Sequence, residues 1–593
     1  MSRTVLGHSV QRSEDAALLV GQARFVEDIA GTSDVHWAVF VRSTAAHGML
    51  VEVDTTAARA GTGVVGVFTA SDLDLPPARA MGGDGALDRP LLARDRVRFV
   101  GEPVAVVVAR TRAQAHDAAE QVAIVTEPLA VVTEAAAANA ADAPLLFPEF
   151  GANETTGRRP PERGEGWPDA EVVVRARLVN PRVAPAPMEP NGCVVRPEGD
   201  RLVVWASTQS VFGVRREIAS ALGVDESTVS VRAPAVGGGF GAKGGVYVEQ
   251  LLVAALARQL GVSVAWVETR HENLCNMTHG RAQMHDVEIG ARRDGTIVGL
   301  RVRGIADVGA YPIRGAFIPM VTRFMASGTY RIPAIEFHAQ IALTNTTPTG
   351  PYRGAGRPEA AALLERSIDV LARMLDRDPV DVRRRNFVPP DAFPYRTPTG
   401  AVYDTGDYER ALDAALAASD YDAWRREQSI RRGRGDRLQL GIGIGCYVEV
   451  SGRGGEFGSV RVEPDGTATV VTGSVPNGQG HETVWAQIAS AVLGVPFEDV
   501  RVVHSDTERV PHGVGTFGSR STQLAGSAVH DAARAVLDQA RALVARRLEA
   551  ADDDIVVFAD GRLGVAGAPA LALTWVEIAA VATGSTATGR TGL

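Results

Sequence analysis

Apolar and polar positions follow two different periods along the chain, and together they predict strands mixed with helices. Runs rich in Val and Phe over 36–41 and 97–108 predict strands. Apolar residues at helical spacing predict helices over 113–122, 246–260, 408–418 and 573–582. The pattern indicates the α+β class.

Changes in composition divide the chain into four regions. Residues 1–135 predict a compact α+β unit. Residues 136–168 are rich in Ala, Pro, Gly, Glu and Arg, which predicts an exposed linker. A long α+β region spans 169–400 and ends in a Pro-rich stretch, and a last region spans 401–593.

One order of elements occurs twice. IASALGV (218–224) precedes a strand and a glycine-rich segment, and IASAVLGV (488–495) precedes a strand and GVGTFGSRST. A solenoid would repeat at a fixed short period. We therefore interpret the pattern as two related halves that clasp one ligand, with coincidence between common α+β units as the alternative.

The segment 236–245, VGGGFGAKGG, contains six glycines in ten positions. Such a bare backbone lets amide groups approach a large anionic ligand. Its GxGxxG spacing lies between a predicted strand and helix, and the next predicted strand ends at Glu268. That order also matches the dinucleotide-binding unit of a Rossmann-type NAD-dependent dehydrogenase, which stays an alternative.

Three further loops combine glycines with Arg, Gln, Ser or Thr, which hydrogen-bond oxygen-rich ligands. One such loop alone is most often a surface turn. Together with the polar strand end Ser207–Gln209, four of them favour one extended site with phosphate and heterocycle components. The three loops are PYRGAGRPEA (351–360), PNGQGHE (476–482) and GVGTFGSRST (513–522).

Charge and cysteine content narrow the function. A net charge of −9 and a pI near 5.8 argue against a nucleic-acid-binding protein. No leader-like or membrane-spanning segment is evident, so we expect a cytoplasmic protein. Cys193, Cys275 and Cys446 are too few and too scattered for an iron–sulfur cluster, and we expect buried or idle thiols.

Ten sequence blocks, taken in order, identify a family. Besides the loops above they are GHSVQRSEDAALLVGQARFVEDI (7–29), RSTAAHG (42–48), VRFVGEPVAVVVA (97–109), PMEPNG (187–192), WASTQS (205–210), VGGGFGAK (236–243) and WVETRHENL (266–274). Together they resemble the molybdopterin-binding large subunit of the xanthine dehydrogenase/aldehyde oxidase (molybdenum hydroxylase) family, especially members similar to aerobic carbon monoxide dehydrogenase.

The resemblance implies a domain order. An N-terminal hammerhead α/β domain would occupy 1–135, and a linker would follow over 136–168. Two elongated α+β molybdopterin-binding domains would then occupy 169–400 and 401–593, the second of them incomplete.

The resemblance also assigns roles to residues of the loops. It implies a substrate pocket formed by Gly244, Tyr352, Gly354 and Ala355. It implies no metal ligand from the protein, because the pterin dithiolene holds the molybdenum. The implied cofactor-binding residues are Gln209, Gly239, Phe240 and Gly241 near the metal, Arg353 opposite them, and Gly478, Gln479, Gly480, Gly518, Ser519, Arg520, Ser521 and Thr522 for the pterin and its phosphate or nucleotide.

The implied activity is the hydroxylation of a carbon centre with water as oxygen donor. The cofactor would be molybdopterin in its cytosine dinucleotide form. Electrons would pass to a small [2Fe–2S] subunit and a medium FAD subunit, which are the implied partners.

Two differences from the family patterns narrow the range of expected substrates. Carbon monoxide oxidisers carry copper on a cysteine in the loop that here reads RGAG (353–356). Purine oxidisers have Phe where Ala355 stands and Glu where Gly244 stands. We therefore expect an aldehyde or an N-heterocycle as substrate.

Family members also carry a GxGE motif whose Glu is the general base. This sequence shows no such motif, so it identifies no catalytic residue; Glu449 and Glu482 are the nearest candidates by loop context. We expect either a separate polypeptide to complete the site or an inactive, truncated cofactor-binding fragment.

Overall fold

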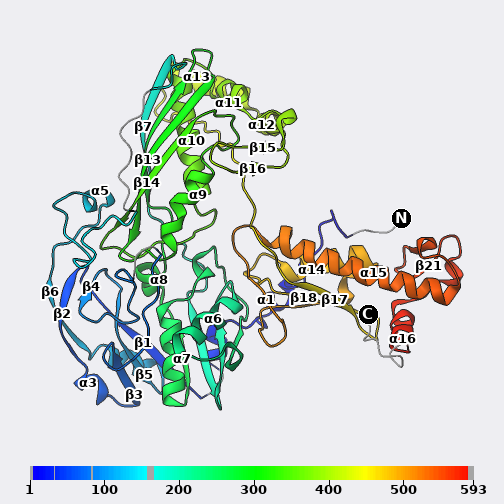
Figure 1. Cartoon of the computed structure of the whole chain (residues 1–593), viewed down its shortest axis with the longest axis horizontal. Coiled ribbons are helices and arrows are strands. Elements are labelled where there is room, and N and C mark those ends of the chain that lie inside the picture. Colours follow the sequence, from blue (N-terminus) through cyan, green and yellow to red (C-terminus); the bar gives the residue numbers. More distant parts are fainter. Residues whose placement is uncertain (1–4, 32–33, 82–84, 157–165, 585–593) are drawn as a thin grey trace.

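A computed structural model describes residues 5–31, 34–81, 85–156 and 166–584. Three parts are visible in Figure 1. A lower lobe is built on a seven-stranded sheet, an upper lobe on a four-stranded sheet, and an arm at the right on a three-stranded sheet. The mixture of strands and helices confirms the α+β class.

The seven-stranded sheet joins strands from two distant parts of the sequence. β1 pairs in parallel with β11, with Val35 opposite Ser263. Every residue of β5 is buried, as expected for a strand covered on both faces. The N-terminal region thus shares one sheet with the region that follows it. In spatial order the strands are β10 (Val229–Arg232), β9 (Arg201–Ala206), β8 (Gly192–Glu198), β11 (Ser263–Val267), β1 (Val35–Arg42), β5 (Pro103–Ala109) and β3 (Val64–Thr69).

The predicted strand over 97–108 is divided in the structure, so that expectation was wrong. Its first part belongs to β4 (Arg96–Val97), and a turn at Gly101 separates it from β5. Gly101 has φ +101°, and a Cβ there would lie 3.0 Å from the carbonyl oxygen of Cys275. The remaining elements of this region are β2 (Gly48–Asp54), β6 (Ala123–Pro128), α2 (Val26–Ala30), α3 (Thr56–Arg59) and α4 (Arg112–Ala119).

The first half of the expected linker is packed rather than exposed. α5 (Ala135–Ala138) precedes Leu146 and Phe147, which are 0% and 2% exposed. The Phe147 ring packs edge-on against Tyr311 at 5.7 Å between centroids. Burial of two large apolar side chains outweighs the polar composition around them. Residues 157–165 of the expected linker lie outside the described residues.

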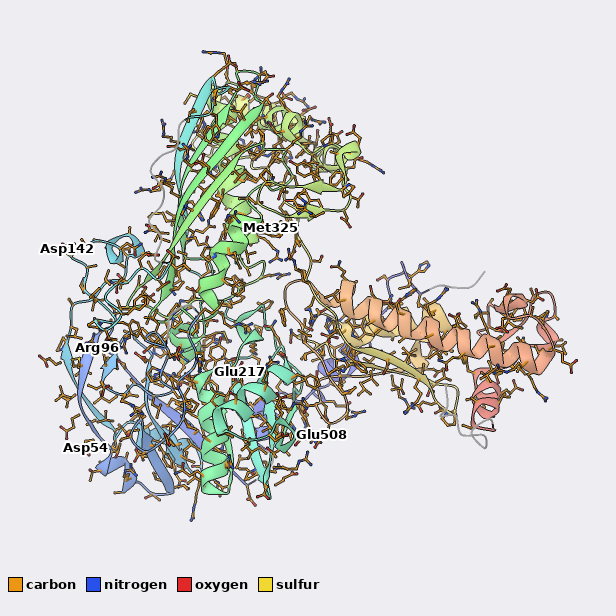
Figure 2. The ribbon with its side chains drawn as sticks, in the orientation of Figure 1. Asp54, Arg96, Asp142, Glu217, Met325 and Glu508 are labelled. Carbon is orange, nitrogen blue, oxygen red and sulfur yellow. The ribbon has the colours of Figure 1, made fainter. Side chains whose placement is uncertain are left out.

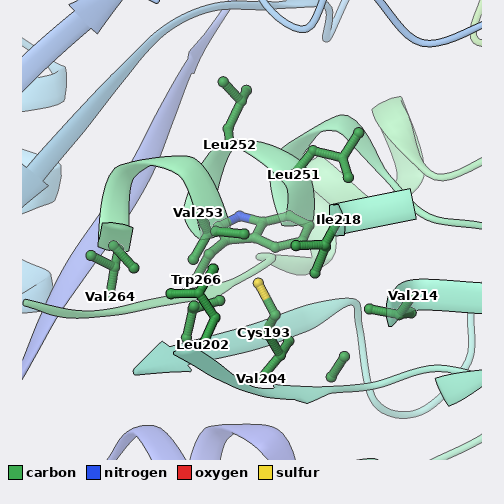
Figure 3. Packing of buried hydrophobic residues seen from close by; sticks show 14 of the residues in the cluster. Cys193, Leu202, Val204, Val214, Ile218, Leu251, Leu252, Val253, Val264 and Trp266 are labelled. Atoms are coloured by element: carbon green, nitrogen blue, oxygen red, sulfur yellow. The ribbon is translucent and has the colours of Figure 1, made fainter. Parts of the chain in front are cut away.

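Helices α6 (Val211–Leu222) and α7 (Val248–Leu260) cover the lower sheet and bury its largest core. Figure 3 shows Trp266 surrounded by side chains from both helices and from the sheet. Cys193 lies within this core, and burial raises the pKa of its thiol. This agrees with the expectation of a buried, unreactive cysteine.

The upper lobe packs α10 against the four-stranded sheet, as Figure 1 shows. Leu364, Ile368 and Leu371 of α10 meet Ile289 and Val302 of the sheet. The strands are β7 (Val172–Asn180), β12 (Gln283–Ala291), β13 (Ile297–Gly309) and β14 (Ile335–Leu343), and the helices are α9 (Ile318–Phe324), α10 (Arg357–Met374), α11 (Pro379–Asn386), α12 (Tyr408–Ser419) and α13 (Tyr421–Arg434), with the hairpin β15 (Tyr395–Arg396) and β16 (Val402–Tyr403). Helix α8 (Arg270–Asn276) belongs to the lower lobe, where Glu272 pairs with Arg42 of β1 (Figure 1).

The arm has its own core, in which Trp485 is fully buried. The N-terminal segment with α1 (Asp15–Leu19) also packs here, since Glu14 accepts hydrogen bonds from Thr483. The elements of the arm are β17 (Gly458–Val462), β18 (Ala468–Thr472), α14 (His481–Leu493), β19 (Val500–Val503), α15 (Ser527–Leu548), β20 (Ile555–Val557), β21 (Leu563–Val565) and α16 (Trp575–Gly584).

The repeat predicted from the sequence is present as two ββαβ units. In each, an antiparallel strand pair leads to a helix and then to a strand parallel to its neighbour. The units are β8-β9-α6-β10 and β17-β18-α14-β19. Both helices end on a left-handed glycine, Gly223 and Gly494, because only glycine adopts this conformation without strain.

Within the described residues, no helix combines the length and the apolar character that a bilayer crossing requires.

Candidate cofactor site

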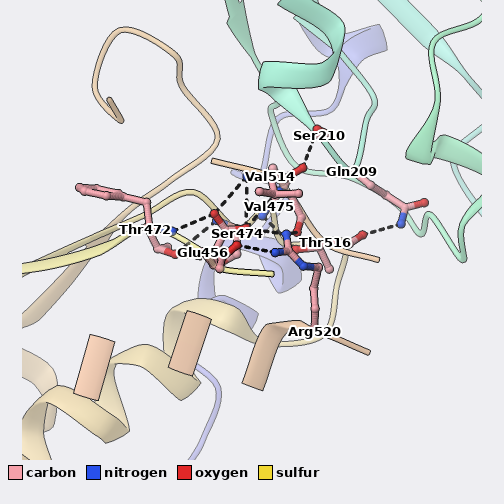
Figure 4. A network of polar contacts seen from close by, with 12 residues as sticks. Gln209, Ser210, Glu456, Thr472, Ser474, Val475, Val514, Thr516 and Arg520 are labelled. Carbon is pink, nitrogen blue, oxygen red and sulfur yellow. Dashed lines mark hydrogen bonds and ion pairs between the residues drawn. The ribbon is translucent and has the colours of Figure 1, made fainter. Parts of the chain in front are cut away.

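Gln209 lies where the two units meet. It lies three residues after the end of β9, and its side-chain Oε1 accepts a hydrogen bond from the amide of Gly241 (2.9 Å). Its Nε2 donates to the carbonyl oxygen of Thr516 (2.7 Å), a contact drawn in Figure 4. The Thr516 amide in turn donates to the carbonyl oxygen of Gln209 (2.9 Å). One residue thus ties the glycine segment of the first unit to the glycine loop of the second.

The glycine segment and the 351–360 loop are in direct contact. Gly241 has φ +97°, and a Cβ on it would lie 2.7 Å from the carbonyl oxygen of Pro351. The Arg353 amide donates to the carbonyl oxygen of Phe240 (2.8 Å), and the Arg353 guanidinium lies 6.0 Å from the centroid of the Phe240 ring. Phe240 is 40% exposed, so its ring borders open space at this junction. Gly239 packs against the Gln209 side chain, since a Cβ there would lie 2.7 Å from it.

Arg281 holds the 351–360 loop. Its Nη1 donates to the carbonyl oxygen of Tyr352 and its Nη2 to that of Arg353, both at 2.7 Å. The loop then turns through Gly354 and Ala355, which both have positive φ. Ala355 is therefore held in a left-handed conformation by its surroundings.

A buried ion pair below the glycine segment was missed by the sequence analysis. Lys243 is 1% exposed, and its Nζ lies 3.0 Å from Glu189 Oε2 and 2.7 Å from Ser207 Oγ. Burial lowers the pKa of Lys243, and Glu189 opposes this. Glu189 also accepts from the amide of Gly237 (2.9 Å). The only signal was a lysine among glycines; its role is to anchor the segment.

A second buried ion pair organises the 513–522 loop (Figure 4). Arg520 Nη1 lies 3.0 Å from Glu456 Oε2, and Glu456 also accepts from the amides of Val514 and Gly515. Arg520 was expected to bind the cofactor, but its side chain is 2% exposed and bonded to protein groups. Its effect on a ligand would therefore come through the loop that it holds.

The other expected residues of this loop lie further out. Gly518 and Ser519 are exposed and have positive φ. Ser519 Oγ donates to Glu449 Oε1 (2.6 Å). Ser521 and Thr522 begin a π-helical turn, Ser521–Gly526, that leads into α15.

The 476–482 loop joins the same region, because the Val475 amide donates to Thr516 Oγ1 (3.0 Å). Gly478 and Gly480 both have positive φ. Gln479 Nε2 donates to His481 Nε2 (2.9 Å). Burial lowers the pKa of His481 to about 4, with His504 as a further cause, so the imidazole is neutral and can accept this bond.

Both glutamates considered as a general base have protein partners. Glu482 Oε1 lies 3.0 Å from His504 Nε2. Glu449 accepts from Ser519 and lies 3.3 Å from Arg357 Nε. Neither carboxylate takes part in the hydrogen bonds of Gln209 described above.

The Rossmann alternative is wrong. β10 and β11 flank α7 in sequence, yet β9 and β8 lie between them in the sheet. Glu268, the acid expected to bind a ribose, is 2% exposed and accepts from Asn191 and Asn273 inside the protein. Burial raises the pKa of Glu268 to about 7. The residue is part of the core.

The surface around these loops fits a large anionic group. Gly478 and Gly518 are exposed, have positive φ and show nothing within 4 Å of a Cβ position, so backbone amides can approach a ligand there. A Cβ on Gly244 would lie 4.0 Å from Gln209 Oε1, in space that the glycine leaves open. Among the residues described, no cluster of His, Cys, Asp and Glu suited to a metal occurs.

Comparison with known proteins shows the family of the chain. Residues 153–387 and 414–592 each match the molybdopterin cofactor-binding domain family, and residues 20–130 match the aldehyde oxidase and xanthine dehydrogenase a/b hammerhead domain. The nicotine 6-hydroxylase large subunit of Paenarthrobacter nicotinovorans is 36% identical over 98% of this chain and 73% of its own length. The carbon monoxide dehydrogenase large chain of Hydrogenophaga pseudoflava is 36% identical over 91% and 72%.

A solved structure shares the fold closely. Quinoline 2-oxidoreductase from Pseudomonas putida 86 superposes with a TM-score of 0.91 at 34% identity, covering 99% of this chain and 77% of that one. The hammerhead domain and the two cofactor-binding domains are therefore confirmed. The chain belongs to the xanthine dehydrogenase/aldehyde oxidase family of molybdenum hydroxylases, as a molybdopterin-binding large subunit.

Proposed function

We propose that this chain is the substrate-oxidising subunit of a hydroxylase that acts on an N-heterocycle or an aldehyde, with water as oxygen donor. The observation that carries the proposal is the position of Gln209, whose side chain bridges Gly241 and Thr516. The bridge brings the predicted metal-proximal and pterin-proximal loops into one site. Two relatives are named for N-heterocycles, nicotine and quinoline, which favours that class.

In this proposal the loops share the cofactor. Gln209, Gly239, Phe240, Gly241 and Arg353 border its metal end. Gly478–Gly480 and Gly518–Thr522 receive the pterin and a cytosine nucleotide through exposed amides and hydroxyls. The bound cofactor would supply the two-electron oxidation. The protein's part is to hold it between two rigid loop anchors, Glu189–Lys243 and Glu456–Arg520.

The substrate would lie near Gly244, Tyr352, Gly354 and Ala355. Small residues at 244 and 355 leave room for a ring. The RGAG sequence at 353–356 has no cysteine to carry copper, so the carbon monoxide activity named for one relative is not proposed. The partners would be a small [2Fe–2S] subunit and an FAD-binding medium subunit.

Co-expression with such partner subunits tests the proposal. Wild-type protein should copurify with molybdenum and with a pterin that releases cytidine monophosphate on hydrolysis. It should also oxidise quinoline or benzaldehyde with an artificial electron acceptor, and the product should contain ¹⁸O from labelled water. Gln209→Ala should lose most bound molybdenum and turnover. Gln121→Ala, at an exposed position after α4, should lose neither.

Two outcomes would contradict the proposal. Absence of molybdenum in the wild-type complex would refute cofactor binding by these loops. Full molybdenum content without turnover on either substrate class would favour the alternative of a cofactor-binding fragment that is inactive.

A further inference from the structure

Arg314 lies at the edge of the proposed substrate pocket. It begins a short 3₁₀ turn, Arg314–Phe317, just before α9. A Cβ on Gly245 would lie 2.5 Å from Arg314 Nη1, and one on Gly244 would lie 3.6 Å from the same atom. The guanidinium therefore rests on the bare backbone of these two glycines. It shares with Gln209 the space that a side chain at position 244 would fill.

The turn that carries Arg314 is fixed against the neighbouring loop. A Cβ on Gly315 would lie 2.1 Å from Thr349 Oγ1 and 2.7 Å from the Thr349 carbonyl oxygen. Thr349 lies two residues before Pro351, which contacts Gly241. The guanidinium is thus placed by packed backbone rather than by a mobile loop.

Arg314 is a half-buried cation. Its guanidinium forms no hydrogen bond or ion pair with any residue in the part of the chain that the structure describes. Burial lowers the pKa of Arg314, and only Tyr247 and Glu217, beyond ion-pair distance, oppose this. By contrast, buried Lys243, Arg383 and Arg520 each contact a carboxylate. A buried charge is costly unless a partner compensates it.

We infer that Arg314 is a specificity-determining residue that binds a carboxylate group of the substrate on the Gly244 side of the pocket. The planar guanidinium matches a carboxylate through two parallel hydrogen bonds. The inference rests on the proposed function for the position of the pocket. It narrows the substrate class to a heterocycle or aldehyde that carries an acid group.

The binding of two matched probes to the complete enzyme tests whether Arg314 recognises a carboxylate. Nicotinate and nicotinamide share one ring and differ in carboxylate against carboxamide. Equilibrium dialysis should show that wild type binds nicotinate at least tenfold more tightly than nicotinamide. Arg314→Met should abolish this preference, and Arg314→Lys should keep part of it.

A second variant acts without removing the charge. Gly245→Ala places a methyl group where Nη1 now lies, and the φ of −117° at this position accepts alanine. The displaced guanidinium should reduce the nicotinate preference. Arg373→Met, at an exposed position near the end of α10, should leave it unchanged.

The outcomes separate this inference from the proposed function. Equal binding of both probes by wild type, or a preference retained in Arg314→Met, overturns the role of Arg314. Molybdenum content is measured on the same samples. A wild type without molybdenum that still prefers nicotinate contradicts the proposed function while it supports the anion site.

Discussion

Glu456 and Arg520 form a buried ion pair whose side chains are 1% and 2% exposed, with 3.0 Å between Oε2 and Nη1. The same carboxylate accepts from two amides of the 513–522 loop. That loop presents the Thr516 carbonyl oxygen to Gln209. The pair therefore controls the contact between the two halves of the site, although both of its side chains are buried and bonded to protein groups.

Removal of Arg520 from this ion pair should lower the stability of the arm. Arg520→Met leaves a buried, uncompensated carboxylate, and we expect a loss of about 3–5 kcal/mol in the free energy of unfolding of the arm. Urea unfolding and bound molybdenum measure the effect. Arg177→Met removes an exposed pair with Asp286 and should cost far less, because solvent screens exposed ion pairs. Equal losses in the two variants would show that Glu456 is not held as described.

Gly241→Ala should separate the glycine segment from the 351–360 loop. A residue at φ +97° pays about 1–2 kcal/mol for a left-handed backbone. The new methyl group would also meet the Pro351 carbonyl oxygen at 2.7 Å. In Gly199→Ala, at φ +61°, no atom lies within 4 Å of the new methyl group, so this variant carries only the backbone cost. We expect loss of molybdenum in the first variant and retention in the second; metal analysis decides.

His481 should make the arm sensitive to acid. Its native pKa of about 4 lies below the ordinary value of 6.5. As the pH falls from 6.5 to about 4, His481 takes up a proton in the unfolded chain but stays neutral in the native protein. The free energy of unfolding therefore decreases by up to about 3 kcal/mol. His481→Gln should flatten urea-unfolding stability between pH 6.5 and 4.

The matched control for this prediction is His530→Gln, because His530 is exposed on α15. This variant should keep the wild-type pH profile. A wild-type slope that persists in His481→Gln would assign the acid sensitivity to another group.

Arg281 should control the order of the 351–360 loop. Arg281→Lys can no longer donate from a planar fork to the carbonyl oxygens of Tyr352 and Arg353. We expect faster amide hydrogen exchange over 351–357 and a several-fold lower molybdenum content. Arg292→Lys, at an exposed pair with Asp169, should change neither quantity. Unchanged exchange in Arg281→Lys would show that the loop is held by its glycine turns alone.

The elements with strong periodicity were predictable within a few residues. The helix expected over 408–418 is α12, Tyr408–Ser419, and the one expected over 246–260 is α7, Val248–Leu260. The helix expected over 573–582 begins two residues later, at Trp575. Short-range spacing suffices in these cases, because a helix must bury one apolar face whatever its neighbours are.

Expectations that depended on long-range burial were less successful. The linker expected over 136–168 contains Leu146 and Phe147, which lie in a core beside Tyr311. The GxGxxG pattern has the spacing of a nucleotide-binding turn, yet the strands around it are not neighbours. Local composition does not specify which distant surface a segment will meet.

Motif spacing and periodicity are local properties of the chain, and from them alone the family, the repeated order of helix and strand, and the four glycine-rich loops were predicted. Three-dimensional packing was needed to show that β1 joins β11 and that Lys243 and Arg520 pair with Glu189 and Glu456. It also showed that, among the residues that the structure describes, no acid forms an ion pair with Arg314. The two ion pairs depend on the desolvation of charges that lie 54 and 64 residues apart in the sequence, and that cost is set by packing rather than by sequence spacing.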